Sequence, residues 1–172
     1  EIMTAYDPKI AKFATAGNRT NTYDDKDSRV VMRDHFSKQF PKLDIDFAGE
    51  KDRFDLVAYK KNSSEIVCLF ELDHSQKNDW QYPKWGYYSV LERKEKSMSE
   101  LNKKIPVIMV WINQSMTKYI ALNLRDVNIF DYPVQAISYV KEEDRKHLKH
   151  PGDFHRRIPL CSNPVYEIGE NI

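Results

Sequence analysis

Two runs of β-forming residues, separated by a polar turn, predict a β-hairpin in the first half of the chain. Apolar and aromatic residues dominate positions 53–59 and 65–72, and the intervening Lys60-Lys61-Asn62-Ser63-Ser64 is typical of a turn. If the turn centres near Ser63, the strands pair with their acidic residues at the end far from the turn.

The register of this hairpin decides which side chains share a face. In the predicted register Asp55 lies opposite Glu71 and Val57 lies opposite Leu69, and alternation along the strand adds Asp73 to the face of the other two acids. A slip of one residue would move Asp55 to the other face. That other face is expected to carry a continuous apolar set, namely Phe54, Leu56, Ile66, Cys68, Phe70 and Leu72. The acid-bearing face also carries Val57, Tyr59, Val67 and Leu69, so we expect helices to cover both sides of the hairpin.

Helical and strand patterns flank the hairpin. Asp27-Ser28 can cap a helix that ends at Pro41, in which large apolar residues recur at four-residue spacing. A second helix is predicted from about Lys84 to Lys103, followed by strands at 105–112 and 119–124. Strands that alternate with helices predict an α/β fold with a mixed central β-sheet flanked by helices. At 172 residues, we expect a single domain over 1–172.

Composition limits the classes of function. The chain is 41% hydrophobic and 31% charged, its net charge is +1, and no apolar segment is long enough to span a membrane or has the pattern of a signal peptide. The two cysteines, Cys68 and Cys161, do not form a disulfide framework. We therefore expect a cytoplasmic protein without a membrane partner, whose nucleic-acid contacts, if it makes any, are local patches.

The three acids at the end of the hairpin predict a metal site. Unpaired carboxylates packed together repel one another, so they need either solvent or a cation. Mg²⁺ takes oxygen ligands from one or two carboxylates and leaves coordination positions for substrate phosphate. The spacing alone is equally compatible with ordinary surface acids at a strand end.

The order of these elements resembles the core of the PD-(D/E)xK, or restriction-endonuclease-like, nuclease superfamily, over about residues 27–125. Asp55 corresponds to the family's Asp, Glu71 to its Asp/Glu, and Asp73 to the position usually held by Lys. The resemblance implies hydrolysis of DNA phosphodiester bonds with Mg²⁺ or Mn²⁺. Asp55, Glu71 and the Leu72 carbonyl would be metal ligands, and Asp73 would join them or orient the attacking water.

Two positions depart from the family pattern. Phe54 stands where the name-giving Pro would be, and Asp73 replaces the catalytic Lys. Lys77, four residues further on, is a candidate for a migrated catalytic lysine.

Candidate nucleic-acid contacts lie in two places. Lys84 and Gln81 are close in sequence to the acids, and Trp80, Tyr82 and Trp85 are candidates to stack on bases, although such aromatic residues also pack in cores. A basic run later in the chain is the larger patch, with a solvated surface as its alternative interpretation. Its candidate phosphate contacts are Arg145, Lys146, Lys149, Arg156 and Arg157.

Histidines offer two further interpretations. His74, beside Asp73, is a candidate base or ligand, or a simple hydrogen-bond partner. The four residues His147, His150, His155 and Cys161 are zinc-ligand types, but their spacing fits no standard zinc finger.

Three classes of function remain open from the sequence. The first is a metal-dependent endonuclease acting on DNA. The second is a catalytically inactive nuclease-like domain that binds nucleic acid or a protein. The third is a hydrolase that uses Glu71 and Asp73 as an acid/base pair, for example on a glycoside, but residues two apart on one strand cannot flank a sugar ring. The oligomeric state stays open, including a homodimer.

Overall fold

The predicted hairpin forms the middle of the main sheet. In the computed structural model, which describes residues 26–49, 52–75, 79–80, 87–132, 134–136, 154–159 and 164–169, strands β2 (Leu56–Lys60) and β3 (Ile66–His74) pair antiparallel. Leu56 lies opposite Phe70 and Val57 lies opposite Leu69, so the predicted register is confirmed. The hydrogen bonding continues beyond the start of β2, because the Asp55 N–H donates to the Phe70 carbonyl at 2.8 Å.

A β-bulge between Ala58 and Tyr59 changes the direction of side chains near the turn. Tyr59 pairs with Ile66, so Ile66 packs with the core on the acid-bearing face, while Val67 is 38% exposed. The predicted faces are wrong for Ile66 and Val67, because strict alternation holds only in a regular ladder. Phe54 also packs on the acid-bearing face, since it lies before the regular part of β2.

Six strands form a mixed sheet within a mixed α/β fold, as the sequence predicts. Strands β3 and β5 are parallel, and the other neighbouring pairs are antiparallel. A parallel pair needs a crossover connection, and helix α3 (Glu92–Asn102) lies within it. The strand order is β1-β2-β3-β5-β6-β9, with β1 at Leu43–Phe47, β5 at Val107–Ile112, β6 at Lys118–Asn123 and β9 at Tyr166–Glu167.

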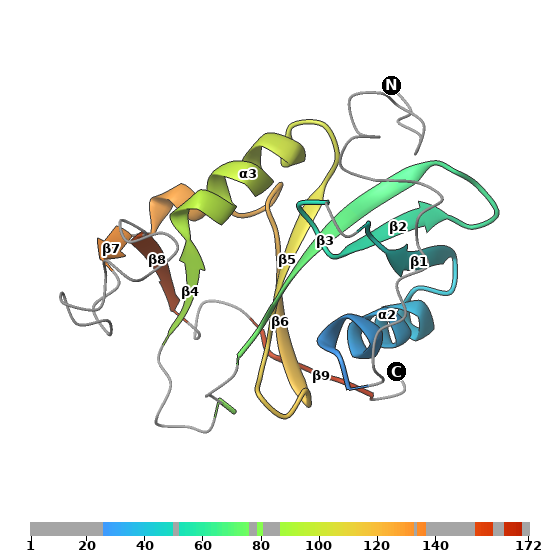
Figure 1. Cartoon of the computed structure of the whole chain (residues 1–172), viewed down its shortest axis with the longest axis horizontal. Coiled ribbons are helices and arrows are strands. Elements are labelled where there is room, and N and C mark those ends of the chain that lie inside the picture. Colours follow the sequence, from blue (N-terminus) through green and yellow to red (C-terminus); the bar gives the residue numbers. More distant parts are fainter. Residues whose placement is uncertain are drawn as a thin grey trace.

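Within the described residues, one helix covers each face of the main sheet, as its two apolar faces predict (Figure 1). Helix α2 (Ser28–Gln39) packs on β1 and β3 through residues such as Phe36. It begins at the predicted cap, because the Asp27 side chain accepts a hydrogen bond from a backbone N–H of the first turn. Helix α3 packs on β5 from the other side. Neither of the helices described is long and apolar enough to cross a membrane.

A second, smaller sheet takes the place of half of a predicted helix. The sequence predicted one helix from about Lys84 to Lys103, but Tyr87–Leu91 forms strand β4 and the helix begins at Glu92. This part of the prediction is wrong because β4 pairs with β8, a strand far along the chain, and aromatic and β-branched residues favour a strand once a partner is present. The order is β4-β8-β7, with β7 at Val134–Ala136 and β8 at Phe154–Pro159, and a short 3₁₀ turn, η1, spans Ile129–Asp131.

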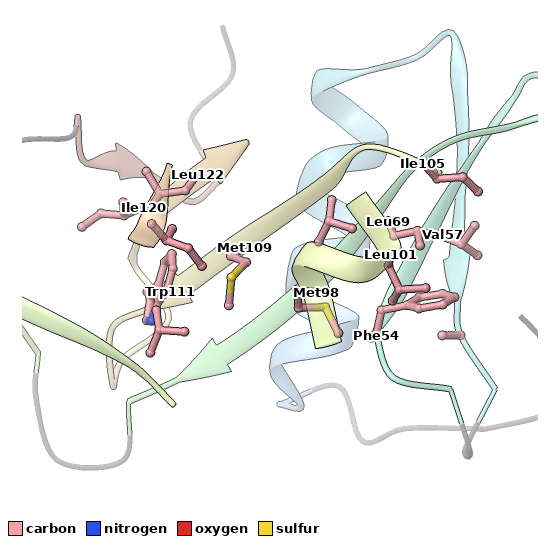
Figure 2. Close-up of a cluster of buried hydrophobic side chains, with 14 of the residues drawn as sticks. Phe54, Val57, Leu69, Met98, Leu101, Ile105, Met109, Trp111, Ile120 and Leu122 are labelled. Atoms are coloured by element: carbon pink, nitrogen blue, oxygen red, sulfur yellow. The ribbon is translucent and has the colours of Figure 1, made fainter. Parts of the chain in front are cut away.

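The hydrophobic core is divided by the main sheet into two clusters. The cluster under α2 includes Phe36 and Phe70, whose rings stack with centroids 4.7 Å apart. The cluster under α3 is shown in Figure 2, where Met98 and Leu101 of the helix lie over the side chains of the sheet. Glu71 and Asp73 alternate with Leu69 along β3, so their carboxylates lie on the α3 side, where this second cluster ends. Sheet residues of the second cluster labelled in Figure 2 are Val57, Leu69, Met109, Trp111, Ile120 and Leu122.

Candidate active site

The hairpin brings three carboxylates close together, with Glu71 and Asp73 on the face of the main sheet that α3 covers and Asp55 beside them. Asp55 lies just before β2, and Glu71 and Asp73 lie two residues apart on β3. Asp55 Oδ2 accepts a hydrogen bond of 2.8 Å from the Leu72 N–H, which holds this side chain against β3. Glu71 is 8% exposed, whereas Asp55 and Asp73 are half-buried. These three residues are called the carboxylate cluster.

A lysine from α3 meets this cluster. Lys94 Nζ lies 3.2 Å from Glu71 Oε1, and its charge also acts on Asp73 and Asp55. Lys94 is the third residue of α3, the helix within the crossover that joins β3 to β5. This crossover places the Lys94 ammonium group near the end of β3. Lys94 was not predicted from the sequence, and Lys77, the predicted migrated lysine, lies outside the described residues.

Burial raises the pKa values of all three carboxyls in the cluster, and repulsion between carboxylates adds to the rise for Asp55 and Glu71. Burial raises the pKa of Glu71 to about 7, and the Asp55 carboxylate adds to this rise while Lys94 opposes it. Burial likewise raises the pKa of Asp55 and of Asp73. Burial alone would lower the pKa of Lys94, but Glu71 and then Asp73 raise it above its ordinary value. A carboxyl that titrates near neutrality next to a lysine that stays charged is a pattern found at functional sites.

The charge balance of the cluster suits a divalent cation. When all three carboxyls are ionised, Lys94 neutralises one of three negative charges, and the remaining charge is held in a largely buried place where it is costly. Among the residues that the structure describes, no three His, Cys, Asp or Glu side chains are arranged as a complete metal-binding group. Two carboxylates are enough for Mg²⁺, since water and substrate phosphate supply the other ligands. The donor types present therefore fit Mg²⁺ or Mn²⁺.

The residue after Lys94 fixes α3 to the smaller sheet. Glu95 is fully buried, and both of its carboxylate oxygens accept hydrogen bonds from Arg156 Nε, at 2.8 and 2.7 Å. Arg156 Nη1 also donates to the Tyr132 carbonyl at 2.6 Å, and the guanidinium lies over the Phe130 ring, 5.1 Å from its centroid. We call this arrangement the Glu95–Arg156 clamp. It joins α3 to the smaller sheet, whereas the pair of Lys94 with Glu71 joins the same helix to the main sheet.

Arg156, predicted as a phosphate contact, lies in this clamp, where its guanidinium donates to Glu95 and to the Tyr132 carbonyl. Arg157 is half-buried on β8. Trp80 is 5% exposed and packs in the core, which favours the core interpretation over base stacking. His74 Nε2–H donates to the Gln114 carbonyl at 3.0 Å, so it acts as a hydrogen-bond partner. The other predicted residues lie outside the described part of the chain, namely Lys77, Gln81, Tyr82, Lys84, Trp85, Arg145, Lys146, Lys149 and the zinc candidates His147, His150 and Cys161, as does the side chain of His155.

One signal in the sequence could have identified Lys94. With Met98 and Leu101 it follows the i, i+4, i+7 spacing of a single helix face, and the other two positions are apolar and buried. A lysine on the buried stripe of a helix needs a negative partner. The acidic end of the predicted hairpin, with Asp55, Glu71 and Asp73, could supply this negative partner.

The comparisons with known proteins do not add a family to this picture. No protein-family model matches the chain, and a search of curated proteins finds no similar sequence.

Proposed function

We propose that this protein is a metal-dependent nuclease that hydrolyses phosphodiester bonds of DNA, with a restriction-endonuclease-like core and its active site at the carboxylate cluster. The observation that carries the proposal is the position of Lys94 among the three carboxylates. Its ammonium lies 3.2 Å from Glu71 Oε1 and acts on Asp73, which occupies the place of the family's usual lysine. The positive charge missing from β3 is therefore supplied by α3.

Each group of the cluster has a distinct task in this proposal. Asp55 and Glu71 would hold Mg²⁺ or Mn²⁺, with the Leu72 carbonyl nearby, and Asp55 is oriented for this by its hydrogen bond from the Leu72 N–H. The bound ion would supply charge neutralisation at the scissile phosphate and a lower pKa for the attacking water. Lys94 would donate hydrogen bonds to the phosphate oxygens, where negative charge increases in the transition state.

Asp73 has two roles that follow from its position. Its charge helps to raise the pKa of Lys94, so the lysine remains a donor at neutral pH. Its own pKa is raised by burial, which makes its carboxylate a better proton acceptor for the attacking water than an exposed aspartate. A carboxylate is thus a functional replacement at this position when the lysine comes from another element.

The second candidate is a nuclease-like domain that binds nucleic acid or a protein without cleaving. The departure at Asp73 favours it, because a domain that has lost activity need not keep the lysine on β3. The presence of Lys94 favours the active enzyme, because a half-buried lysine is costly to keep without a use.

One experiment separates the two candidates. The protein is incubated with circular DNA, linear DNA and RNA, with Mg²⁺, with Mn²⁺ and with chelator. We expect cleavage of DNA that requires metal and is abolished in Asp55→Asn and in Glu71→Gln. Asp126→Asn serves as the matched control, because Asp126 is exposed and remote from the cluster. Binding without cleavage under every metal would favour the inactive domain, and metal-dependent cleavage that survives both cluster substitutions would place the active site elsewhere.

A further inference from the structure

A polar hollow of about 370 Å³ opens beside the carboxylate cluster. Asp55 and Leu72 belong to its wall, so the hollow and the cluster share a carboxylate. The remaining wall comes from His74 at the end of β3 and from the segment Lys26–Arg29 that leads into α2. The start of α2 therefore lines the hollow, whereas Lys94 of α3 contacts the cluster beside it.

The hollow is lined by two cationic side chains, Lys26 and Arg29, and by two carboxylates, Asp27 and Asp55. Arg29 Nε and Nη2 donate to the Asp27 carboxylate at 2.9 and 2.7 Å, so these two charges balance each other. The same carboxylate caps α2 through the Arg29 N–H, so its acceptor oxygens are engaged within this wall. Burial raises the pKa of Asp55, the Arg29 guanidinium opposes the rise, and the Asp27 carboxylate adds to it. Both charges of this wall therefore lie close enough to act on the cluster.

A nucleic-acid substrate gives such a hollow a specific use. When one phosphodiester lies at the cluster, the next phosphodiester of the same strand lies one nucleotide away and must rest on the adjoining surface. Ammonium and guanidinium groups are the side chains that bind phosphate oxygens most strongly, and such contacts fix the register of a strand without reading its bases. We propose that the hollow binds the phosphodiester next to the scissile one, with Lys26 and Arg29 as its phosphate contacts. This inference rests on the proposed nuclease function.

A larger hollow elsewhere does not suit this role. It has a volume of about 740 Å³ and lies between α2 and the β6–β9 edge of the sheet, where Phe36, Phe40 and Tyr119 contribute aromatic walls. None of the three carboxylates lines it, and its walls are mainly apolar. Phosphate recognition near the cluster therefore belongs to the smaller hollow.

The test compares Lys26→Gln and Arg29→Gln with the control Lys60→Gln. Lys26 and Lys60 are both exposed, but Lys60 lies at the turn end of the hairpin, far from Asp55. Binding to fluorescein-labelled single-stranded and duplex DNA is measured by anisotropy at several salt concentrations, in chelator. Each hollow variant should reduce the slope of log K against log salt by about 0.7 for single strands and about 0.9 for duplex. In cleavage assays the same variants should raise KM and leave kcat nearly unchanged, because the contact is made equally in the ground and transition states.

Lys26→Arg and Arg29→Lys keep the charge and should keep the slope of the parent protein. Because Lys26 is exposed, its variants give a result even if Arg29→Gln disturbs the start of α2. If the parent cleaves DNA but both hollow variants match Lys60→Gln in slope and KM, the inference is overturned and the proposed function stands. If the parent neither binds nor cleaves nucleic acid, both are overturned.

Discussion

At the scale of single residues, the site separates into a part that follows from local sequence and a part that does not. Asp55 and Glu71 could be placed from the sequence because a hairpin register depends on a turn and two neighbouring strands. Lys94 could not be placed in the same way, because its partner Glu71 is reached through a crossover whose length and angle are set by the tertiary structure. Under the proposed function, the lysine that compensates for the departure at Asp73 therefore comes from outside the motif.

Lys94→Gln should lower kcat by about 10²–10³, the usual effect of removing one donor that stabilises transition-state charge. It should also move the acid limb of the pH–rate profile upward. Lys94 opposes the rise in the pKa of Glu71 to about 7, so its removal raises that pKa further, and the ionised form is reached only at higher pH. Lys94→Arg should keep the position of the limb.

Lys103→Gln is the control for this prediction, since Lys103 is exposed just beyond the end of α3. An unchanged rate and an unchanged pH profile in Lys94→Gln would exclude Lys94 from the active site.

The raised pKa of Glu71 also predicts how stability depends on pH. The folded protein binds this proton more tightly than the unfolded chain does, because the pKa rises from 4.5 to about 7 on folding. The stabilisation is therefore complete below about pH 4.5 and is lost as the pH rises through about 7. In chelator, Glu71→Gln should raise the free energy of unfolding at about pH 8 by up to about 3 kcal/mol and change it little at about pH 4.5.

Urea denaturation at the two pH values measures this difference, with Asp126→Asn as the exposed control. A loss of stability in Glu71→Gln at the higher pH would show that the pair with Lys94 outweighs burial.

At the scale of secondary-structure elements, the prediction from the sequence was wrong where a segment pairs with a strand far along the chain. Helix α2, strand β5 and strand β6 were predicted because each carries its own periodicity or apolar run. The segment Tyr87–Leu91 has a composition that suits either a strand or a buried helix, and its partner β8 resolves the ambiguity only in the folded protein. The pairing of β4 also affects the position of Lys94, because α3 begins directly after β4 and Lys94 is its third residue.

The Glu95–Arg156 clamp should be essential to the position of α3. Arg156→Met removes the cation that is paired with the fully buried Glu95 and should destabilise the protein by about 3–5 kcal/mol. The double variant Glu95→Leu with Arg156→Met removes both charges and should recover much of that loss. Urea denaturation of the two single variants and the double variant gives the coupling free energy.

Arg125→Met is the matched control, because Arg125 is exposed. If the single and double variants are equally unstable, the loss is one of packing and the ion pair does not position α3.

At the scale of the whole molecule, the covering of both sheet faces follows from the hairpin alone. Both faces are apolar, and in the described part of the chain each is covered by one helix (Figure 1). Glu71 and Asp73 lie near the end of β3, beyond the apolar residues of that strand. The smaller sheet was not predicted, because its strands come from distant segments and only their pairing makes them recognisable. Burial by these layers is also what raises the pKa of all three carboxyls.

Because the whole fold determines this burial, a bound cation should stabilise the whole fold, and the effect should depend on pH. A metal that binds the folded protein and not the unfolded chain raises the free energy of unfolding by about 2.7 kcal/mol at a hundred times its Kd. Glu71, whose pKa is about 7, is protonated at about pH 5 and ionised at about pH 8, and only the ionised form is a good ligand. Mg²⁺ should therefore raise Tm clearly at about pH 8 and little at about pH 5. Thermal melts with Mg²⁺ and with chelator at both pH values test this, and Asp55→Asn should abolish the Mg²⁺ effect while Asp126→Asn retains it. An equal rise in Tm at both pH values, or a rise that survives in Asp55→Asn, would show that the ion binds outside the carboxylate cluster.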